Sequence, residues 1–129
     1  MKLLYPVLSQ SKWGFINAAG ELLIDAVFEE VREFSEGLAA VELKNKWGFI
    51  DKEGQIIIDT KYDKTTNFSE DYAGILLNDK WGFINKSGEV VIDFKYDRIH
   101  DFDNGIALVR INNKETYIDK YDRFVRDTL

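Results

Sequence analysis

The 129-residue sequence contains no cysteine, a single histidine, a single proline and a single methionine. Without cysteine there is no disulfide scaffold, no thiol nucleophile and no zinc site with sulfur ligands. One histidine argues against a metal site built from several histidines, and it leaves the serines without a suitably placed general base. We therefore expect no enzymatic activity, no metal and no cofactor.

Basic residues are in the minority, and long apolar runs are missing. The chain has 17 Lys and Arg against 23 Asp and Glu, a net charge of −6. This balance argues against nucleic acid as a partner, because phosphates are bound by clustered basic side chains. No apolar stretch approaches the ~20 residues that span a bilayer, and the apolar start of the chain is too short for a signal peptide. We expect a cytoplasmic protein without membrane contact.

The sequence is dominated by a repeat of 34 residues, with an apolar content of 45% that is sufficient for a packed core. KWGFIN begins at Lys12 and Lys80, KWGFID begins at Lys46, and a degraded copy, KETYID, begins at Lys114. We assign the aromatic and glycine columns of the three full copies to the structural core: Trp13, Trp47, Trp81, Phe15, Phe49, Phe83, Gly20, Gly54, Gly88, Phe34, Phe68 and Phe102.

The pattern inside each repeat has the period of strands. Residues 107–111 alternate between small or aliphatic side chains on one face and freely varying ones on the other. Asn112 and Asn113, which tolerate positive φ, then predict a tight hairpin, and the segment KWGFI predicts a second strand. A turn that begins with Asn or Asp and ends with Gly leads to a third strand, as over residues 22–25.

The sequence therefore predicts one all-β domain over residues 1–129. Four three-stranded antiparallel meander units, joined by eleven-residue linkers, are expected to stack as a curved, open solenoid. Closure into a small propeller or barrel fits the same period and strand count. We expect linker aromatics to fill the gaps between meanders and the tryptophan rings to be buried there. The predicted units cover about residues 3–25, 37–59, 71–93 and 105–127.

The run L-A-x-V-x-x-x-x-K-W-G-F-I-[ND]-x-x-G-x-x-[IV]-I-D, which returns every 34 residues, resembles the bacterial WG (KWG) repeat family. The resemblance implies all-β repeats with a binding role and without common catalytic residues. Stand-alone members are similar to immunity-type proteins that accompany bacterial toxins. The sequence departs from the family pattern at residues 114–117 and at Asp71, which replaces the glycine of Gly37 and Gly105.

A specific partner would be recognised through the outward columns that differ between repeats. We expect Tyr72 and Leu76 to be exposed apolar anchors beside the acids Glu70 and Asp71, an arrangement suited to a basic protein. The candidate partner-binding residues are Glu36, Glu42, Glu70, Asp71, Tyr72, Leu76, Asp101, Asp103 and Arg110.

The sequence favours a non-enzymatic module that binds another protein, and neutralisation of a basic bacterial toxin is the sharpest form of that hypothesis. The alternative is a carbohydrate or cell-wall binding module, which solvent-stacked tryptophan rings would favour. A calcium site at the column of Asp25, Asp59 and Asp93 is disfavoured, because calcium needs about six to eight converging oxygens.

Overall fold

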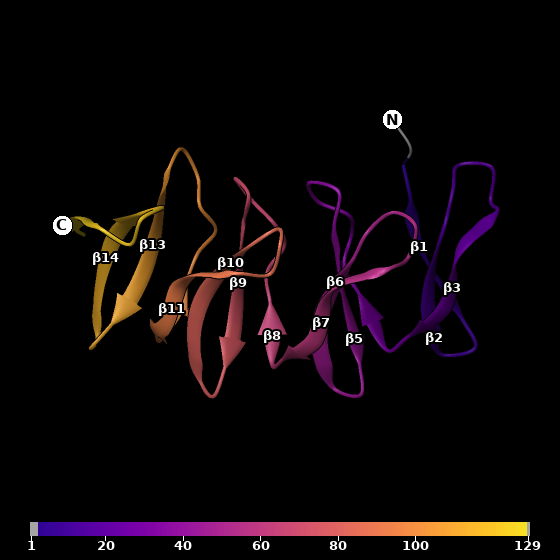
Figure 1. Cartoon of the computed structure of the whole chain (residues 1–129), viewed down its shortest axis with the longest axis horizontal. Coiled ribbons are helices and arrows are strands. Elements are labelled where there is room, and N and C mark those ends of the chain that lie inside the picture. The colour runs from indigo at the N-terminus through magenta and orange to yellow at the C-terminus, as the bar shows by residue number, and fades with distance from the viewer. Residues whose placement is uncertain (1–2, 129) are drawn as a thin grey trace. The chain divides into compact units, whose positions relative to one another are not determined.

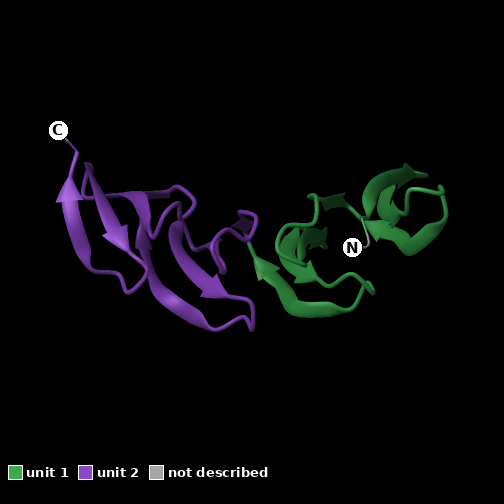
Figure 2. Ribbon diagram, turned by 90° about the horizontal axis from the view of Figure 1, so that it is seen from above, with its two compact units in different colours: residues 1–62 green, residues 63–129 purple. Residues whose placement is uncertain are grey.

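The computed structural model describes residues 3–128, and its regular elements over that range are all β-strands (Figure 1). The chain divides into two compact units, residues 1–62 and residues 63–129 (Figure 2). Each unit contains two antiparallel sheets. In the part of the chain that the structure describes, no helix is long and apolar enough to cross a membrane.

Unit 1 holds a three-stranded first sheet and a four-stranded second sheet. Their strand orders are β1-β2-β3 and β4-β5-β6-β7, so neighbours in sequence are neighbours in the sheet. The strands are β1 (Tyr5–Ser9), β2 (Lys12–Ile16), β3 (Leu22–Phe28), β4 (Glu30–Val31), β5 (Ala39–Leu43), β6 (Lys46–Ile50) and β7 (Ile56–Tyr62).

Unit 2 holds the third and fourth sheets, ordered β8-β9-β10-β11 and β12-β13-β14-β15. None of the four sheets, as described over residues 3–128, closes into a barrel. The all-β repeat of open antiparallel sheets predicted from the sequence is therefore confirmed. The strands are β8 (Lys64–Thr65), β9 (Tyr72–Leu77), β10 (Lys80–Asn85), β11 (Val90–Tyr96), β12 (Arg98–Ile99), β13 (Ile106–Ile111), β14 (Lys114–Asp119) and β15 (Phe124–Asp127).

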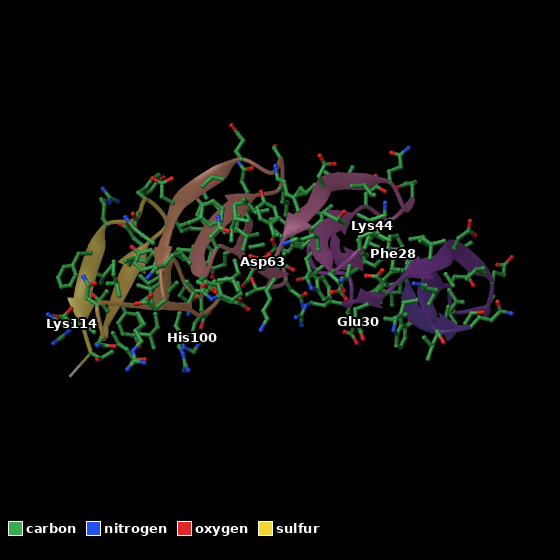
Figure 3. The ribbon with its side chains drawn as sticks, turned by 90° about the horizontal axis from the view of Figure 1, so that it is seen from below. Phe28, Glu30, Lys44, Asp63, His100 and Lys114 are labelled. Atoms are coloured by element: carbon green, nitrogen blue, oxygen red, sulfur yellow. The ribbon has the colours of Figure 1, made fainter. Side chains whose placement is uncertain are left out.

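Two-residue turns join the first and second long strands of every repeat, and the turn at Asn112 and Asn113 is the tight hairpin that the sequence predicts. Both turn residues have positive φ, the conformation of the hairpin turn that matches strand twist. Lys44, labelled in Figure 3, belongs to one of these turns. The turn pairs are Gln10 and Ser11, Lys44 and Asn45, Asn78 and Asp79, and Asn112 and Asn113.

The turn before each third strand is held by its first side chain. Asn17 Oδ1 accepts hydrogen bonds from the backbone N–H groups of Ala19 and Glu21, each at 3.0 Å. Gly20 then takes a φ of 84°, and Asp122 takes a φ of 63° at the same place in the last repeat. Asp is an acceptable residue there, because its short side chain tolerates the left-handed region.

The third strands are longer than predicted because a bulge lies in the middle of each full copy. Trp47 pairs with Tyr62, and Phe49 pairs with Ile58, so β7 advances four residues while β6 advances two. The same shift separates the corresponding pairs in the first and third sheets. The extra backbone arches over the residue between Trp and Phe.

This arch requires the glycine of the Trp-Gly-Phe segment. A Cβ atom at Gly48 would lie 2.3 Å from the carbonyl oxygen of Ile58, well inside van der Waals contact. At Gly14 and Gly82 the corresponding backbone distances are 2.4 Å and 2.5 Å. The missing side chain of this glycine allows a neighbouring strand to approach closely, and that neighbour is the third strand of the same sheet.

The fourth sheet lacks the arch, which explains why its second strand tolerates threonine in place of the glycine. Thr116 pairs with Asp127 and Tyr117 pairs with Arg126, in unbroken register. The Thr116 hydroxyl donates to the carbonyl oxygen of Arg126 at 3.1 Å. The degraded copy is thus a regular three-strand pairing at this point.

Each predicted linker contains strand structure. The segment 26–36 holds the end of β3 and the two-residue strand β4, which pairs with β5 of the following meander. Strands β8 and β12 occupy the same place before β9 and β13. The second, third and fourth sheets therefore have four strands, whereas the first sheet has three over residues 3–128.

Within each unit, the Phe-bearing face of one sheet packs on the small-residue face of the next. In unit 1, Phe15 shares a buried cluster with Ala39 and Val41, and the ring of Phe34 meets Phe15 edge-on at 4.9 Å. In unit 2, Phe83 meets the linker ring of Phe102 at 4.8 Å. Linker aromatics do fill these gaps, with an edge-to-face geometry that aromatic quadrupoles favour.

The tryptophan rings are only half-buried, so the expectation of full burial is wrong. Each Trp follows the lysine beside a hairpin turn and is the second residue of its strand. Trp13 and Trp81 pack on the margins of the two clusters. The guanidinium of Arg32 lies 5.2 Å from the ring centroid of Trp47. The phenylalanine two residues later takes the fully buried position instead.

One column described above as freely varying is constrained. Ala40 is fully buried, and Gly74 lies so close to the next sheet that an added Cβ would be 2.0 Å from Ile99 Cδ1. The first long strands β5 and β9 therefore carry buried residues at successive positions, on both of their faces. The alternation in the sequence predicts only one buried face. Ala40 and Gly74 are small, and a small residue does not by itself show whether its position is packed.

An acid in each linker connects successive hairpins. Glu29 accepts hydrogen bonds from the backbone N–H groups of Lys44 and Asn45 at 3.1 Å and 3.0 Å. Asp97 pairs with Lys80 at 2.5 Å, and it also accepts from the backbone of Asn112. The bond from Asn45 holds the pKa of Glu29 below its usual value, and the Lys80 ammonium does the same for the pKa of Asp97.

Replacing the arched-over glycine tests the origin of the signature. Gly48→Ala is expected to destabilise the protein by about 3 kcal/mol, because the new methyl group overlaps a backbone carbonyl that cannot move freely. The measurement is urea unfolding followed by tryptophan fluorescence. Gly37→Asn is the control, with a cost of less than about 1 kcal/mol, since open space surrounds Gly37. Equal stability of Gly48→Ala and the parent protein would contradict the explanation that the arched backbone requires glycine at this position.

The linker acids predict an acid-sensitive fold. Because the folded-state pKa of Asp97 is lowered, its contribution is fully present above its ordinary value of about 4 and is lost as the pH falls through the folded value. Asp97→Asn is expected to lower stability at pH 7 and to flatten the acid limb of a stability–pH curve. Asp93→Asn, which removes the charge of an exposed acid on β11, serves as the matched control. Parallel curves for both variants would refute the role of Asp97.

Candidate protein-binding surface

Seven of the nine candidate residues fall on two parts of the repeat, whereas Asp101 lies just before the last tight turn and Tyr72 begins β9. The first group lies in the tight turns that isolated bridges close before β5, β9 and β13: Glu36, Glu70, Asp71 and Asp103. The second group occupies one equivalent position on these three strands: Glu42, Leu76 and Arg110.

Glu70 is engaged in a contact inside unit 2. Its carboxylate accepts hydrogen bonds from the backbone N–H groups of Asn104 at 2.5 Å and Gly105 at 2.8 Å. Its carbonyl oxygen accepts from the ammonium of Lys120. The neighbouring Asp71 stays exposed and lies 3.4 Å from Lys86. Glu70 thus connects the turn before β9 to the turn before β13.

Tyr72 is half-buried, so the expectation that it is an exposed anchor is wrong. Its ring meets Phe102 edge-on at 5.4 Å, and its hydroxyl donates to the carbonyl oxygen of Lys120 at 3.1 Å. The Lys120 ammonium lies 4.8 Å from the ring centroid. Burial raises the pKa of the Tyr72 hydroxyl, and the nearby Tyr121 and Asp71 add to the shift. The ring is part of the packing between the third and fourth sheets.

The second group stands in the middle of a row that crosses each sheet beside its hairpin turn. All three members are half-buried, which corrects the expectation that Leu76 is exposed. The row changes its charge along the chain, so it is the most repeat-specific part of the sheets. It contains Glu30, Glu42 and Trp47 in the second sheet, Lys64, Leu76 and Trp81 in the third, and Arg98, Arg110 and Glu115 in the fourth.

The fourth sheet presents a face that differs from its counterparts. Leu108 pairs with Tyr117, and Tyr117 pairs with Arg126, so the three side chains share one face. Leu108 and Tyr117 are half-buried, whereas Arg126 is exposed. The 34-residue alignment shows the change from the third sheet to the fourth: Gly74 to Leu108, Trp81 to Glu115, Phe83 to Tyr117 and Ile92 to Arg126.

A hollow of about 440 Å³ opens on this face. Its floor consists of half-buried apolar side chains, and its rim consists of exposed polar ones. His100, on the rim, points outward from unit 2 in Figure 3. The floor is Ile106, Leu108 and Tyr117, and the rim is His100, Asp101, Asp103 and Asn104.

The structure thus brings together two of the predicted acids, Asp101 and Asp103, with an apolar floor that sequence reasoning missed. An apolar floor inside an acidic rim accommodates an apolar side chain flanked by basic residues. The sequence does contain a signal for this floor, because the last copy has Leu108 in place of Ala40 or Gly74 and Tyr117 in place of the phenylalanine.

A second hollow, of about 360 Å³, lies in unit 1 between the start of β1 and the loop before β5. Glu36 lines it together with Tyr5 and the half-buried Phe34. Across residues 3–128, no group of three or more His, Asp or Glu side chains is placed to hold a metal ion.

One solved structure with a similar fold is described as the crystal structure of the eukaryotic initiation factor. The two chains are 17% identical and superpose with a TM-score of 0.60 over 92% of this chain. The match spans 37% of the other chain, and at this identity it concerns the fold alone. No curated protein matches the sequence significantly.

The family comparison agrees with the repeat seen in the structure. The model of the WG containing repeat matches residues 13–47, 47–81 and 81–114. The matched segments run from one Trp-Gly position to the next, so each spans an arched glycine, a linker and a hairpin. With the signature glycine explained by the bulged third strand and three tandem matches covering most of the chain, this protein belongs to the WG-repeat family.

Proposed function

We propose that this WG-repeat chain is a non-enzymatic module that binds a basic protein through the hollow on its fourth sheet. The observation that carries the proposal is the pairing of an apolar floor with the acids Asp101 and Asp103. Interfaces gain most of their affinity from a few anchors seated in pockets. An apolar side chain of the partner would fill the floor, and neighbouring Lys or Arg residues would meet the rim.

Net charge supports a basic partner. At −6, the chain attracts cations over distances longer than a contact, which raises the association rate at low ionic strength. Because the exposed acids remain in contact with solvent, dissolved salt screens this attraction. Binding that weakens at high salt is the signature expected of such a surface.

The sharpest form of the proposal is an immunity role, in which the partner is a basic bacterial toxin. It rests on the family resemblance and on the acidic charge of the chain. Occupation of the toxin surface would suffice, since the module needs no chemistry of its own. The captured partner would then inhibit growth when produced alone, and co-production of this chain would restore growth.

The geometry of the tryptophans argues against the carbohydrate alternative. Sugar rings stack on open aromatic faces, whereas the ring of Trp47 carries the guanidinium of Arg32. Trp13 and Trp81 pack on the margins of the clusters in units 1 and 2. All three tryptophans are half-buried, whereas such binding uses a row of exposed aromatic faces.

Charge removal at the rim tests the proposal. The double variant Asp101→Asn/Asp103→Asn is expected to weaken binding of the partner by about tenfold, because two close charge pairs are lost. The partner is first recovered from lysate of the source cell at low salt and is identified by mass spectrometry. Its affinity for the parent chain and the variants is then measured with purified proteins at low and high salt.

The control is Asp25→Asn/Asp59→Asn, which changes the net charge equally at exposed acids of unit 1. This variant should bind almost as the parent chain does. Equal weakening by both double variants would show that charge alone acts, without the hollow. Undiminished binding by Asp101→Asn/Asp103→Asn, or recovery of no basic protein at all, would refute the proposed function.

A further inference from the structure

Within residues 3–128, the first sheet has three strands, whereas each of the other three sheets has four. Strands β4, β8 and β12 each pair with the outer edge of the following strand, whereas β1 is the outer strand of its own sheet. Among residues 3–128, no residue pairs with this edge of β1. An unpaired strand edge presents a row of backbone groups that another extended chain can bind.

The three short strands bind in the same way, through two backbone donors. The N–H group of Glu29 donates to the carbonyl oxygen of Glu42, and the N–H group of Arg32 donates to that of Ala40, both at 2.9 Å. The third and fourth sheets repeat these two bonds at distances of 2.8 Å to 2.9 Å. The two acceptors that correspond on β1, 34 residues earlier, are the carbonyl groups of Leu8 and Pro6.

The short strands also share their side-chain chemistry. An acid comes first and accepts from the backbone of the hairpin turn, as Glu29 does from Lys44 and Asn45 and as Asp63 does from Asn78 at 3.2 Å. Two residues later comes an aliphatic or β-branched residue that pairs with the first long strand: Val31, Thr65 or Ile99. The three segments therefore share one sequence pattern: an acid, then any residue, then a β-branched residue.

The matching positions around β1 are exposed. Gln10 and Ser11 form the hairpin turn with φ values of 50° and 71°, the same shape as the turns that the linker acids hold. Leu8 is 56% exposed, whereas its counterparts on β5, β9 and β13 are half-buried. Val7, the counterpart of Val41, is half-buried. An aliphatic side chain of an added segment would therefore pack beside Val7.

We propose that the outer edge of β1 is a strand-addition site for an extended segment of a partner protein with the pattern Asp or Glu, any residue, then Val, Ile or Thr. The added segment would run antiparallel to β1 and donate two N–H groups to the carbonyl oxygens of Leu8 and Pro6. Pro6 has no N–H group, but it keeps the carbonyl group that this bond needs. The acid would accept from the turn at Gln10 and Ser11. Affinity would come from backbone bonds and specificity from the side chains.

This site lies on unit 1 and selects an acidic segment, whereas the hollow of unit 2 selects a basic protein. Failure of one proposal therefore leaves the other standing. Pro6 on an outer strand normally discourages indiscriminate pairing. A site that needs only carbonyl acceptors at Pro6 and Leu8 remains open to a segment with the right donors.

The test uses the second-sheet segment as a probe. An acetylated and amidated peptide with the sequence of residues 26–33, Ala-Val-Phe-Glu-Glu-Val-Arg-Glu, is titrated into the isotope-labelled full chain and followed by amide NMR. We expect saturable binding that moves the amide signals of residues 7–11. The signals of the turns that already carry an acid, such as Lys44 and Asn45, should stay in place.

Two matched peptides separate the parts of the proposal. Replacement of the first Glu of the peptide by Gln is expected to weaken binding by roughly tenfold, because a charge-assisted bond to the turn is lost. N-methylation at that Glu and at the Arg removes both donors while keeping the side chains, and it should abolish saturable binding. Binding of the methylated peptide as tightly as the parent peptide would overturn strand addition.

Three other outcomes would also overturn the proposal. The first is no saturable binding of the parent peptide up to about 1 mM, a weak limit for specific recognition. The second is a set of shifts located on the fourth sheet instead of on residues 7–11. The third is movement of the same β1 signals with protein concentration alone, which would make a second copy of this chain the occupant.

Discussion

The passage of the third-strand backbone over the glycine of each Trp-Gly-Phe segment is the constraint from which the repeat is built. Because the strand bulges there, it regains its pairing two residues late, and the linker aromatic arrives opposite the tryptophan. The acid that follows the aromatic then reaches the next hairpin turn. A single close approach thus sets the position of the aromatic, of the acid and, through the acid, of the following meander. A larger residue at the glycine would disturb all three together.

The parts of the fold that depend on neighbouring residues were predictable from the sequence. Turns at Lys44 and Asn45, or from Asn17 to Gly20, follow from side chains that tolerate positive φ or hold their own backbone. The bulge and the two-residue strands were not predictable, because they arise from pairing between segments that the local pattern does not relate. The half-burial of the tryptophans was not predictable either, because it depends on their position along the strand and not on residue type.

The candidate site shows the same division. Asp101 and Asp103 were recognisable as outward acids, and they lie on the rim of the hollow. Because its column differs between the repeats, the sequence predicts an exposed Tyr72, yet Lys120, 48 residues away, covers the ring. Leu108 and Tyr117 differ from the other copies in the sequence, but it is the pairing of three strands that places both on one face with Arg126. Aligning the repeats finds where they differ, and only the packing tells which differences reach the surface.

The close contact between Gly74 and Ile99 has a consequence for the evolution of such arrays. Duplicated modules are often regarded as interchangeable, so that recombination can lengthen or shuffle them without loss. Here the last copy has Leu108 where the third has glycine, and a branched residue like Ile99 could not settle against it. A further copy appended behind the fourth would need a new interface before it could fold. The third and fourth copies are therefore not interchangeable as supports for a following sheet.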